Sequence, residues 1–196
     1  MTTTRPFVCD DLFRMASTNL DPLTETYNFG FYLTYLTRWP CLCSAQEGAA
    51  GRISSYMIGK AEGEGREWHG HVSALTVAPE FRRLGLAKTL MAELERVSDK
   101  ACVLRGSLRT RMGRLPIRNT PTPTPTPPAR ARIRSYNGYF VDLYVRVGNT
   151  VAVRMYHALG YYVHQRVLGY YGSSDGEPTE DAMDMRKALP REVAAK

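Results

Sequence analysis

Hydrophobic positions recur with two different periods along the chain, and together they predict both helices and strands. Leu86, Leu90, Leu94 and Val97 are three or four positions apart, so they share one face of a helix that begins near Gly85. Short stretches rich in β-branched and aromatic residues predict strands at residues 53–60, 71–77 and 139–145. We also expect short helices at residues 12–16 and 31–36, and closing strands at residues 161–167 and 182–186.

The helix after the third strand has local signals at both ends. Asn149 can cap its first turn, and Gly160 can end it after Leu159. Helices and strands therefore alternate irregularly along the chain, which predicts a mixed α/β domain. At 196 residues the chain is long enough for one such domain with a substantial core.

One segment interrupts this pattern. Residues 101–136 contain eight arginines, no acidic residue and the low-complexity run TPTPTPTPP. A composition of this kind cannot build a core, so we predict a disordered insertion. The folded domain would then comprise residues 1–100 and 137–190, followed by a tail at 191–196.

The basic charge also comes from this segment. The formal net charge is +7, and it falls to −1 when the eight arginines are left out. The charge is therefore no argument for nucleic-acid binding by the folded domain.

Other sequence features bear on the compartment and on metal binding. No stretch approaches the roughly 18 consecutive apolar residues that cross a membrane, and the N-terminal MTTTRPFVCDD lacks the apolar core of a secretory signal. We expect a cytoplasmic protein with reduced thiols and no membrane partner. The four cysteines lack paired metal-ligand spacing, so no metal site is expected.

The segment at residues 71–87 has the features of a phosphate-binding loop. A predicted strand runs into a basic turn and then into the amphipathic helix, whose free N–H groups and dipole favour an anion. Gly85 permits close backbone approach, Ala87 leaves space, and Arg82 and Arg83 can add charged hydrogen bonds. The loop lacks the Walker lysine pattern, so an NTPase is not indicated.

These residues carry a family resemblance. VAPEFRRLGLA resembles the acetyl-CoA pyrophosphate loop of the GNAT N-acetyltransferase superfamily. The blocks LDPLTETY, GKAEG, EWHGHVSAL, VDLYVRVGN, AVRMYHALGY and YYGSSDGEPTEDAMDMRKAL resemble, in order, the catalytic subunits of N-terminal acetyltransferase B (NatB) complexes. The resemblance implies a single GNAT-type domain with a mixed, mostly antiparallel sheet. Helices would cover both faces, and one parallel strand pair would splay apart.

The resemblance also implies a site for acetyl-CoA. Backbone groups of Val77 would bind the pantetheine arm, and Asn149 would bond to the cofactor. The pyrophosphate would lie on the loop formed by Arg82, Arg83, Leu84, Gly85, Leu86 and Ala87. From the residues alone, Asn149 is simply a helix cap and the two arginines are solvated.

The same resemblance implies three catalytic roles. Tyr156 would donate a proton to the departing thiolate, and the backbone N–H near Leu75 would polarise the thioester oxygen. The base that accepts the proton of the amine is left open between His71 and Glu25.

The peptide substrate would lie between two loops and the strand at residues 71–77. His71 and Ser73 alternate on one strand, so they point to the same face, where they could donate to the second side chain of a Met-Asp, Met-Glu, Met-Asn or Met-Gln terminus. The residues expected to close over the peptide are Glu25, Tyr27, Tyr170 and Tyr171. A large helical-repeat auxiliary subunit, the ribosome and the nascent chain are the implied partners.

Two segments depart from the family pattern, and two other functions stay open. Residues 41–46 and 52–55 carry polar residues where apolar strand residues are expected. One alternative is acetylation of lysine or another amine, and the other is a non-catalytic subunit that binds acetyl-CoA or the ribosome. The apolar side chains of the helix near residue 31 predict an exposed interface for the partner, namely Phe31, Tyr32, Leu33, Tyr35, Leu36 and Trp39.

Overall fold

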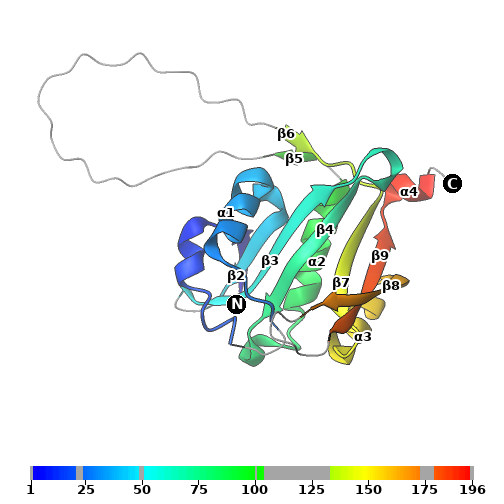
Figure 1. Ribbon diagram of the computed structural model, residues 1–196. Coiled ribbons are helices and arrows are strands. Elements are labelled where there is room, and N and C mark those ends of the chain that lie inside the picture. Colours follow the sequence, from blue (N-terminus) through cyan, green and yellow to red (C-terminus); the bar gives the residue numbers. More distant parts are fainter. Residues whose placement is uncertain are drawn as a thin grey trace, which may run out of the picture.

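A computed structural model describes residues 2–20, 24–48, 51–99, 101–103, 133–172 and 179–194. Its centre is a seven-stranded sheet in the order β1-β2-β3-β4-β7-β9-β8 (Figure 1). The strands are β1 (Thr3–Pro6), β2 (Cys43–Glu47), β3 (Ile53–Glu62), β4 (His69–Val77), β7 (Phe140–Arg146), β8 (Tyr162–Tyr171) and β9 (Glu180–Ala188). Neighbouring strands are antiparallel, except that β4 and β7 run parallel.

Helices cover both faces of this sheet, as predicted (Figure 1). The α-helices are α1 (Phe29–Arg38), α2 (Leu86–Asp99), α3 (Thr150–Ala158) and α4 (Pro190–Ala194). Short 3-10 helices occupy Cys9–Phe13, Pro40–Leu42, Gly65–Glu67 and Pro79–Phe81. Within the described parts of the chain, every helix is too short or too polar to span a bilayer.

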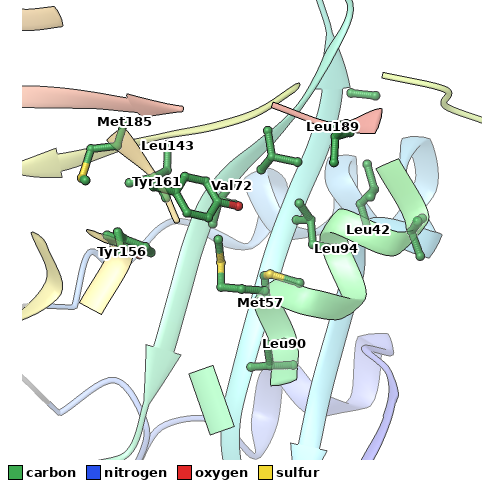
Figure 2. Packing of buried hydrophobic residues seen from close by; sticks show 14 of the residues in the cluster. Leu42, Met57, Val72, Leu90, Leu94, Leu143, Tyr156, Tyr161, Met185 and Leu189 are labelled. Atoms are coloured by element: carbon green, nitrogen blue, oxygen red, sulfur yellow. The ribbon is translucent and has the colours of Figure 1, made fainter. Parts of the chain in front are cut away.

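The two faces bury separate clusters of apolar side chains. Leu90 and Leu94 of α2 pack with Met57 and with Tyr156 of α3 on one face (Figure 2). Tyr32 of α1 packs on the other face. Because side chains alternate along a strand, β3 contributes to both clusters. The helical spacing read from residues 86–97 is therefore confirmed, since Leu86, Leu90, Leu94 and Val97 are all buried.

The prediction that α1 offers a wide exposed stripe is wrong for most of its residues. Tyr32 is 1% exposed, and Phe31, Tyr35 and Leu36 pack against the same core cluster. Trp39 packs against the other cluster. Of the predicted set, only Leu33 is among the exposed large hydrophobic residues. Phe13, Leu20 and Phe29 expose more of their side chains than Leu33 does.

Strand β2 was not predicted because its sequence, CSAQE, is polar. Gln46 is nevertheless 2% exposed, and its side chain is bonded on both sides. Its amide oxygen accepts from Ser55 Oγ at 2.6 Å, and its nitrogen donates to Thr4 Oγ1 at 3.2 Å. Ser54 Oγ donates to the Gln46 carbonyl at 2.9 Å. The two segments that depart from the family pattern therefore lie side by side, and Ser54 and Ser55 both donate to Gln46. The buried hydroxyl of Ser44 has no hydrogen-bond partner among the described residues.

The ends of the predicted insertion are ordered. Strands β5 (Ala101–Val103) and β6 (Ile133–Ser135) pair with each other in antiparallel register, and Tyr136 is buried in the core. The predicted range of 101–136 was thus too wide at both ends. Residues 104–132 lie outside the described residues.

The cysteines only partly match the expectation of reduced thiols. Cys9 is a free, exposed thiol and Cys43 is a free, buried one. Cys41 is disulfide-bonded, so the expectation is wrong for this residue.

Candidate active site

A gap opens in the sheet where the two parallel strands separate. β4 and β7 pair only from Gly70 to Val72 on one strand and from Val141 to Leu143 on the other, although both strands continue further. On the opposite edge of β4, Ile58 pairs with Ala74 and Gly59 pairs with Val72, so Ser73 is an extra, bulged residue. A bulge bends a strand and re-aims its side chains.

A pocket lies at this splay. Its lining comes from β4, β7, α3 and the loop before α1, namely Thr24, Glu25, Val72, Ser73, Ala74, Leu75, Thr76, Leu143, Tyr144, Val145, Asn149, Ala152 and Tyr156. The structure therefore brings together five of the predicted site residues: Glu25, Ser73, Leu75, Asn149 and Tyr156.

Two of these residues come from α3. Asn149 caps the helix, because its Oδ1 accepts from the backbone N–H of Ala152 at 3.1 Å. This cap leaves the amide nitrogen of Asn149 available to a ligand. Tyr156, two turns further along, is 7% exposed, and burial raises the pKa of its phenol well above the usual range. Tyr156 therefore stays protonated and can act as a donor in the pocket.

The predicted phosphate loop has the backbone of a tight, anion-binding turn. Arg83 and Gly85 both have a left-handed φ, of 62° and 78°, directly before α2 begins at Leu86. A Cβ added to Gly85 would meet no atom within 4 Å, so open space adjoins this backbone. Arg82 Nε donates to the carbonyl of Val77 at 3.3 Å and so ties the loop to the end of β4. Free N–H groups at this helix start can bind an anion.

On the peptide side, Arg146 connects the segments that were expected to form the two loops. Its Nε donates to Glu25 at 3.0 Å, and its NH1 group donates to Glu180 at 3.0 Å. Its guanidinium lies 4.2 Å from the ring centre of Tyr171. Burial raises the pKa of Tyr171, whose hydroxyl donates to the carbonyl of Tyr144 at 3.2 Å.

Aromatic rings line both sides of this region. Tyr27 stacks on Phe31 with ring centres 4.0 Å apart and donates to the carbonyl of Ser73 at 3.3 Å. Burial raises the pKa of Tyr27 to about 12. Across the gap, Tyr170 stacks on Tyr144 at 4.7 Å. The predicted residues Tyr27, Tyr170 and Tyr171 thus border the pocket region without lining the pocket itself.

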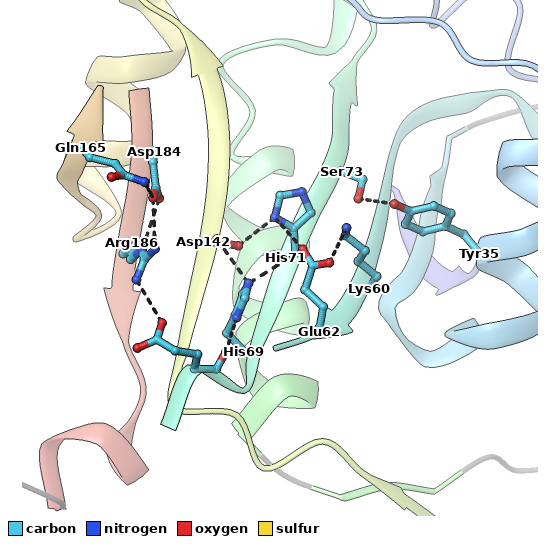
Figure 3. Close-up of polar contacts among 11 residues, drawn as sticks. Tyr35, Lys60, Glu62, His69, His71, Ser73, Asp142, Gln165, Asp184 and Arg186 are labelled. Atoms are coloured by element: carbon cyan, nitrogen blue, oxygen red, sulfur yellow. Dashed lines mark hydrogen bonds and ion pairs between the residues drawn. The ribbon is translucent and has the colours of Figure 1, made fainter. Parts of the chain in front are cut away.

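His71 and Ser73 lie near each other on β4 but have different partners (Figure 3). Ser73 Oγ donates to the hydroxyl of Tyr35 at 2.9 Å. His71 Nδ1 lies 2.8 Å from Oδ1 of Asp142, and the His71 ring lies 5.7 Å from that of Tyr144. His71 is not among the residues that line the pocket at the splay.

Asp142 is a buried carboxylate shared by two imidazoles. Its second oxygen lies 3.3 Å from Nε2 of His69. Burial alone would raise the pKa of Asp142, but the hydrogen bonds from His69 and His71 hold it well below its usual range. Asp142 therefore stays ionised and fixes the orientation of both rings.

Sequence reasoning did not find Asp142, His69, Glu62 or Arg146. One signal was present, because a charged residue inside the apolar strand 139–145 must have a partner when it is buried. The partners could not be read from the sequence, since they depend on which strands become neighbours.

Comparisons with known proteins agree with this architecture. Residues 10–115 match the model of the acetyltransferase (GNAT) family. The chain is 49% identical over 196 residues to N-alpha-acetyltransferase 20 of Dictyostelium discoideum, covering 100% of this chain and 91% of the relative. It is 46% identical to the N-terminal acetyltransferase B complex catalytic subunit NAA20 of Arabidopsis thaliana, covering 100% and 90%.

A solved structure is also similar. The crystal structure of Chaetomium thermophilum Naa20 in complex with a bisubstrate analogue superposes with a TM-score of 0.75 at 35% identity, covering 99% of this chain and 90% of that one. The chain belongs to the acetyltransferase (GNAT) family. Both of the relatives named above are N-terminal acetyltransferases, and the one from Arabidopsis thaliana is the catalytic subunit of an N-terminal acetyltransferase B complex.

Proposed function

We propose that this chain is the catalytic subunit of a NatB-like N-terminal α-acetyltransferase. It transfers the acetyl group of acetyl-CoA to the α-amine of nascent proteins that start with Met-Asp, Met-Glu, Met-Asn or Met-Gln. The observation that carries the proposal is the pocket at the β4–β7 splay. Glu25 and Ser73 reach it from the expected peptide side, and Asn149 and Tyr156 reach it from the expected cofactor side.

The reaction is a direct transfer without an acylated enzyme. The amine nitrogen attacks the thioester carbonyl, a tetrahedral oxyanion forms, and the bond between carbon and sulfur then breaks. A backbone N–H near Leu75 stabilises the oxyanion. The phenol of Tyr156 gives its proton to the leaving thiolate, which would be costly to release unprotonated into a buried site.

The preference for an α-amine over a lysine side chain follows from the lower pKa of the α-ammonium group. An α-ammonium has a pKa of about 8, so roughly a tenth is neutral near pH 7, whereas only about one lysine in a few thousand is neutral. A site with modest base assistance therefore favours N-termini. Of the two candidate bases, Glu25 is paired with Arg146, and His71 is held by Asp142 outside the pocket lining. His71 would consequently act through a water molecule.

His71 and Ser73 are also proposed to recognise the second residue of the peptide. All four preferred second residues carry an acceptor oxygen, and an imidazole N–H and a hydroxyl can donate to it. The hydroxyl of Tyr35, bonded to Ser73, extends this polar surface.

The test is an acetylation assay with purified chain and its partner on a panel of peptides. We expect turnover with a Met-Asp peptide and very little with a Ser-Asp peptide or with an internal lysine in an N-terminally blocked peptide. Turnover confined to the internal-lysine peptide would instead establish a lysine acetyltransferase. Salt-sensitive RNA binding without any turnover would indicate a non-catalytic, ribosome-binding subunit.

The proposal includes a large helical-repeat auxiliary subunit and work on nascent chains at the ribosome in the cytoplasm. No metal ion is needed for the transfer itself. Exposed apolar side chains near the start of α1 support a partner surface, in particular Phe13 and Phe29, whose rings lie 5.9 Å apart. Co-expression followed by size exclusion tests this part. A chain that is soluble, monodisperse and fully active alone would contradict it.

A further inference from the structure

Four side chains of the types that bind transition metals converge beside the active site (Figure 3). Donor atoms of Glu62, His69 and His71 all lie within 4.8 Å of one another. The carboxylate of Asp142 lies against both imidazoles. The cross-strand pairs Glu62–His69 and His71–Asp142 hold these residues on three neighbouring strands, β3, β4 and β7. We propose that Glu62, His69 and His71 bind Zn²⁺ and that Asp142 orients the two imidazoles.

The distances suit a small tetrahedral cation. Zn²⁺ binds nitrogen and carboxylate oxygen at about 2.0–2.2 Å, which places neighbouring tetrahedral donors about 3.4 Å apart. Glu62 Oε1 lies 3.8 Å from Nδ1 of His71 and 3.9 Å from Nε2 of His69. Nε2 of His69 lies 3.3 Å from Asp142. The contacts from Glu62 to both imidazoles have to shorten by about half an ångström. The 2.8 Å contact between His71 Nδ1 and Oδ1 of Asp142 has to open so that Nδ1 can face the ion.

The orientation of His69 gives independent support. Its Nδ1 contacts the carbonyl of Glu67 at 2.5 Å, and because a carbonyl only accepts, Nδ1 carries the proton. Its Nε2 therefore faces the other donor groups, 3.3 Å from Oδ2 of Asp142 and 3.9 Å from Oε1 of Glu62. A backbone carbonyl on the second ring nitrogen is also the usual support of a metal-binding histidine.

The site is open on one side. The side chain of Glu62 is 41% exposed, whereas those of His69, His71 and Asp142 are 12%, 10% and 4% exposed. Lys60 bonds to the other oxygen of Glu62 at 2.6 Å, which leaves Oε1 directed at the imidazoles. An ion can therefore enter past Glu62 without unfolding the sheet, and once bound it would link β3 and β4.

Isothermal titration of the chelator-treated protein with ZnCl₂ tests the proposal, with MgCl₂ as the comparison ion. We expect one Zn²⁺ to bind per protein chain, with an affinity that added Mg²⁺ does not lower. We also expect the melting temperature to rise on binding. His69→Gln and Glu62→Gln should each weaken binding by about 10-fold or more. His164→Gln, an exposed histidine on β8, is the matched control and should leave affinity unchanged.

Two results would overturn the proposal. One is the absence of Zn²⁺ binding up to about 100 μM, which is too weak for a built site. The other is binding that survives both His69→Gln and Glu62→Gln, which would place the ion elsewhere, for example on the cysteines. Glu62 is exposed enough that its variant should fold, and a melting curve of each variant without metal confirms this independently of the binding result.

Discussion

At the scale of single residues, burial decides which side chains keep their protons. Tyr156 and Cys43 are both held in the protonated form because the charged form would lose its hydration. The consequences differ, because Tyr156 lines the pocket and Cys43 lies under α1. The phenol proton of Tyr156 is available to a reaction in the pocket, whereas the thiol proton of Cys43 keeps that thiol unreactive.

We predict that Tyr156→Phe lowers turnover by about 10- to 1,000-fold and leaves acetyl-CoA affinity nearly unchanged. The variant keeps the buried ring and removes only the proton that the leaving thiolate needs. Steady-state kinetics and calorimetry measure the two effects separately. Tyr162→Phe, at an exposed position on β8, serves as the control and should have the same turnover as the unsubstituted protein. Parent turnover in Tyr156→Phe would remove this residue from the mechanism.

We predict that iodoacetamide at pH 8 modifies Cys9 at least about 100-fold faster than Cys43 in the folded protein. Burial raises the pKa of the Cys43 thiol to about 12, so only about one molecule in ten thousand is the reactive thiolate at pH 8. Cys9 is exposed. Peptide mapping by mass spectrometry gives both rates, and equal labelling in denaturant is the control. Equal labelling in the native state would contradict the burial of Cys43.

Local physics was sufficient for some of the candidate site. Asn149 and Gly85 could be identified from the sequence because a helix cap and a left-handed turn depend only on neighbours in the chain. Asp142 and Arg146 could not, since their roles depend on residues 34 to 121 positions away. The residues missed are therefore those whose partners are distant in sequence.

At the scale of elements, the ends of β7, β9 and the loop before α1 meet at one arginine. Exposed ion pairs alone contribute little. Arg146, however, bonds to Glu25 and Glu180 and stacks on Tyr171, so it restrains three segments together. These are the segments proposed to close over the peptide.

We predict that Arg146→Gln raises KM for a Met-Asp peptide by about 3- to 30-fold, with little change in affinity for acetyl-CoA. This corresponds to roughly 0.7–2 kcal/mol, the value of charged hydrogen bonds discounted for partial exposure. Arg96→Gln removes an exposed pair with Glu93 on α2 and is the matched control. An equal loss of kcat with unchanged KM would mean that Arg146 does not position the peptide loops.

In the loop before α2, the charges of the two arginines can be removed while the backbone conformation is kept. We predict that Arg82→Ala combined with Arg83→Gly weakens acetyl-CoA binding by about 1–3 kcal/mol through the loss of charged contacts. Glycine is chosen at position 83 because the native φ of 62° would strain alanine. Calorimetry measures the effect, with Arg96→Gln again as the control. Parent affinity in the double variant would show that the pyrophosphate is not bound here.

Periodicity predicted the elements that bury one clear face, such as α2 and β4, and it failed for β1 and β2. Thr3–Pro6 is short and contains proline, and Cys43–Glu47 is polar. β2 pairs with the edge of β3 and β1 then pairs with β2, while the side chain of Gln46 bonds to Thr4 and Ser55. These stabilising contacts are tertiary, so the sequence pattern within either segment could not predict them.

At the scale of the whole molecule, the insertion leaves and re-enters the domain at adjacent points. Val103 of β5 pairs directly with Ile133 of β6. A directly opposed pair is the position that a two-residue hairpin turn connects. Residues 104–132 also contain seven arginines and no acidic residue, so their removal takes the formal net charge from +7 to zero.

We predict that replacing residues 104–132 by Asn-Gly, the preferred two-residue hairpin turn, leaves the domain folded and active. Shortening the connection from 29 residues to two lowers the entropy of the unfolded chain, so the free energy of unfolding should rise by up to about 2 kcal/mol. Urea unfolding and the peptide assay measure stability and activity on the same preparation. A variant with Gly-Ser repeats of the original length removes the arginines while keeping the loop long. If that variant is active and the short turn is not, the length of the connection is required; if both lose activity, the arginines or neighbouring residues of the segment act in catalysis or in binding the partner.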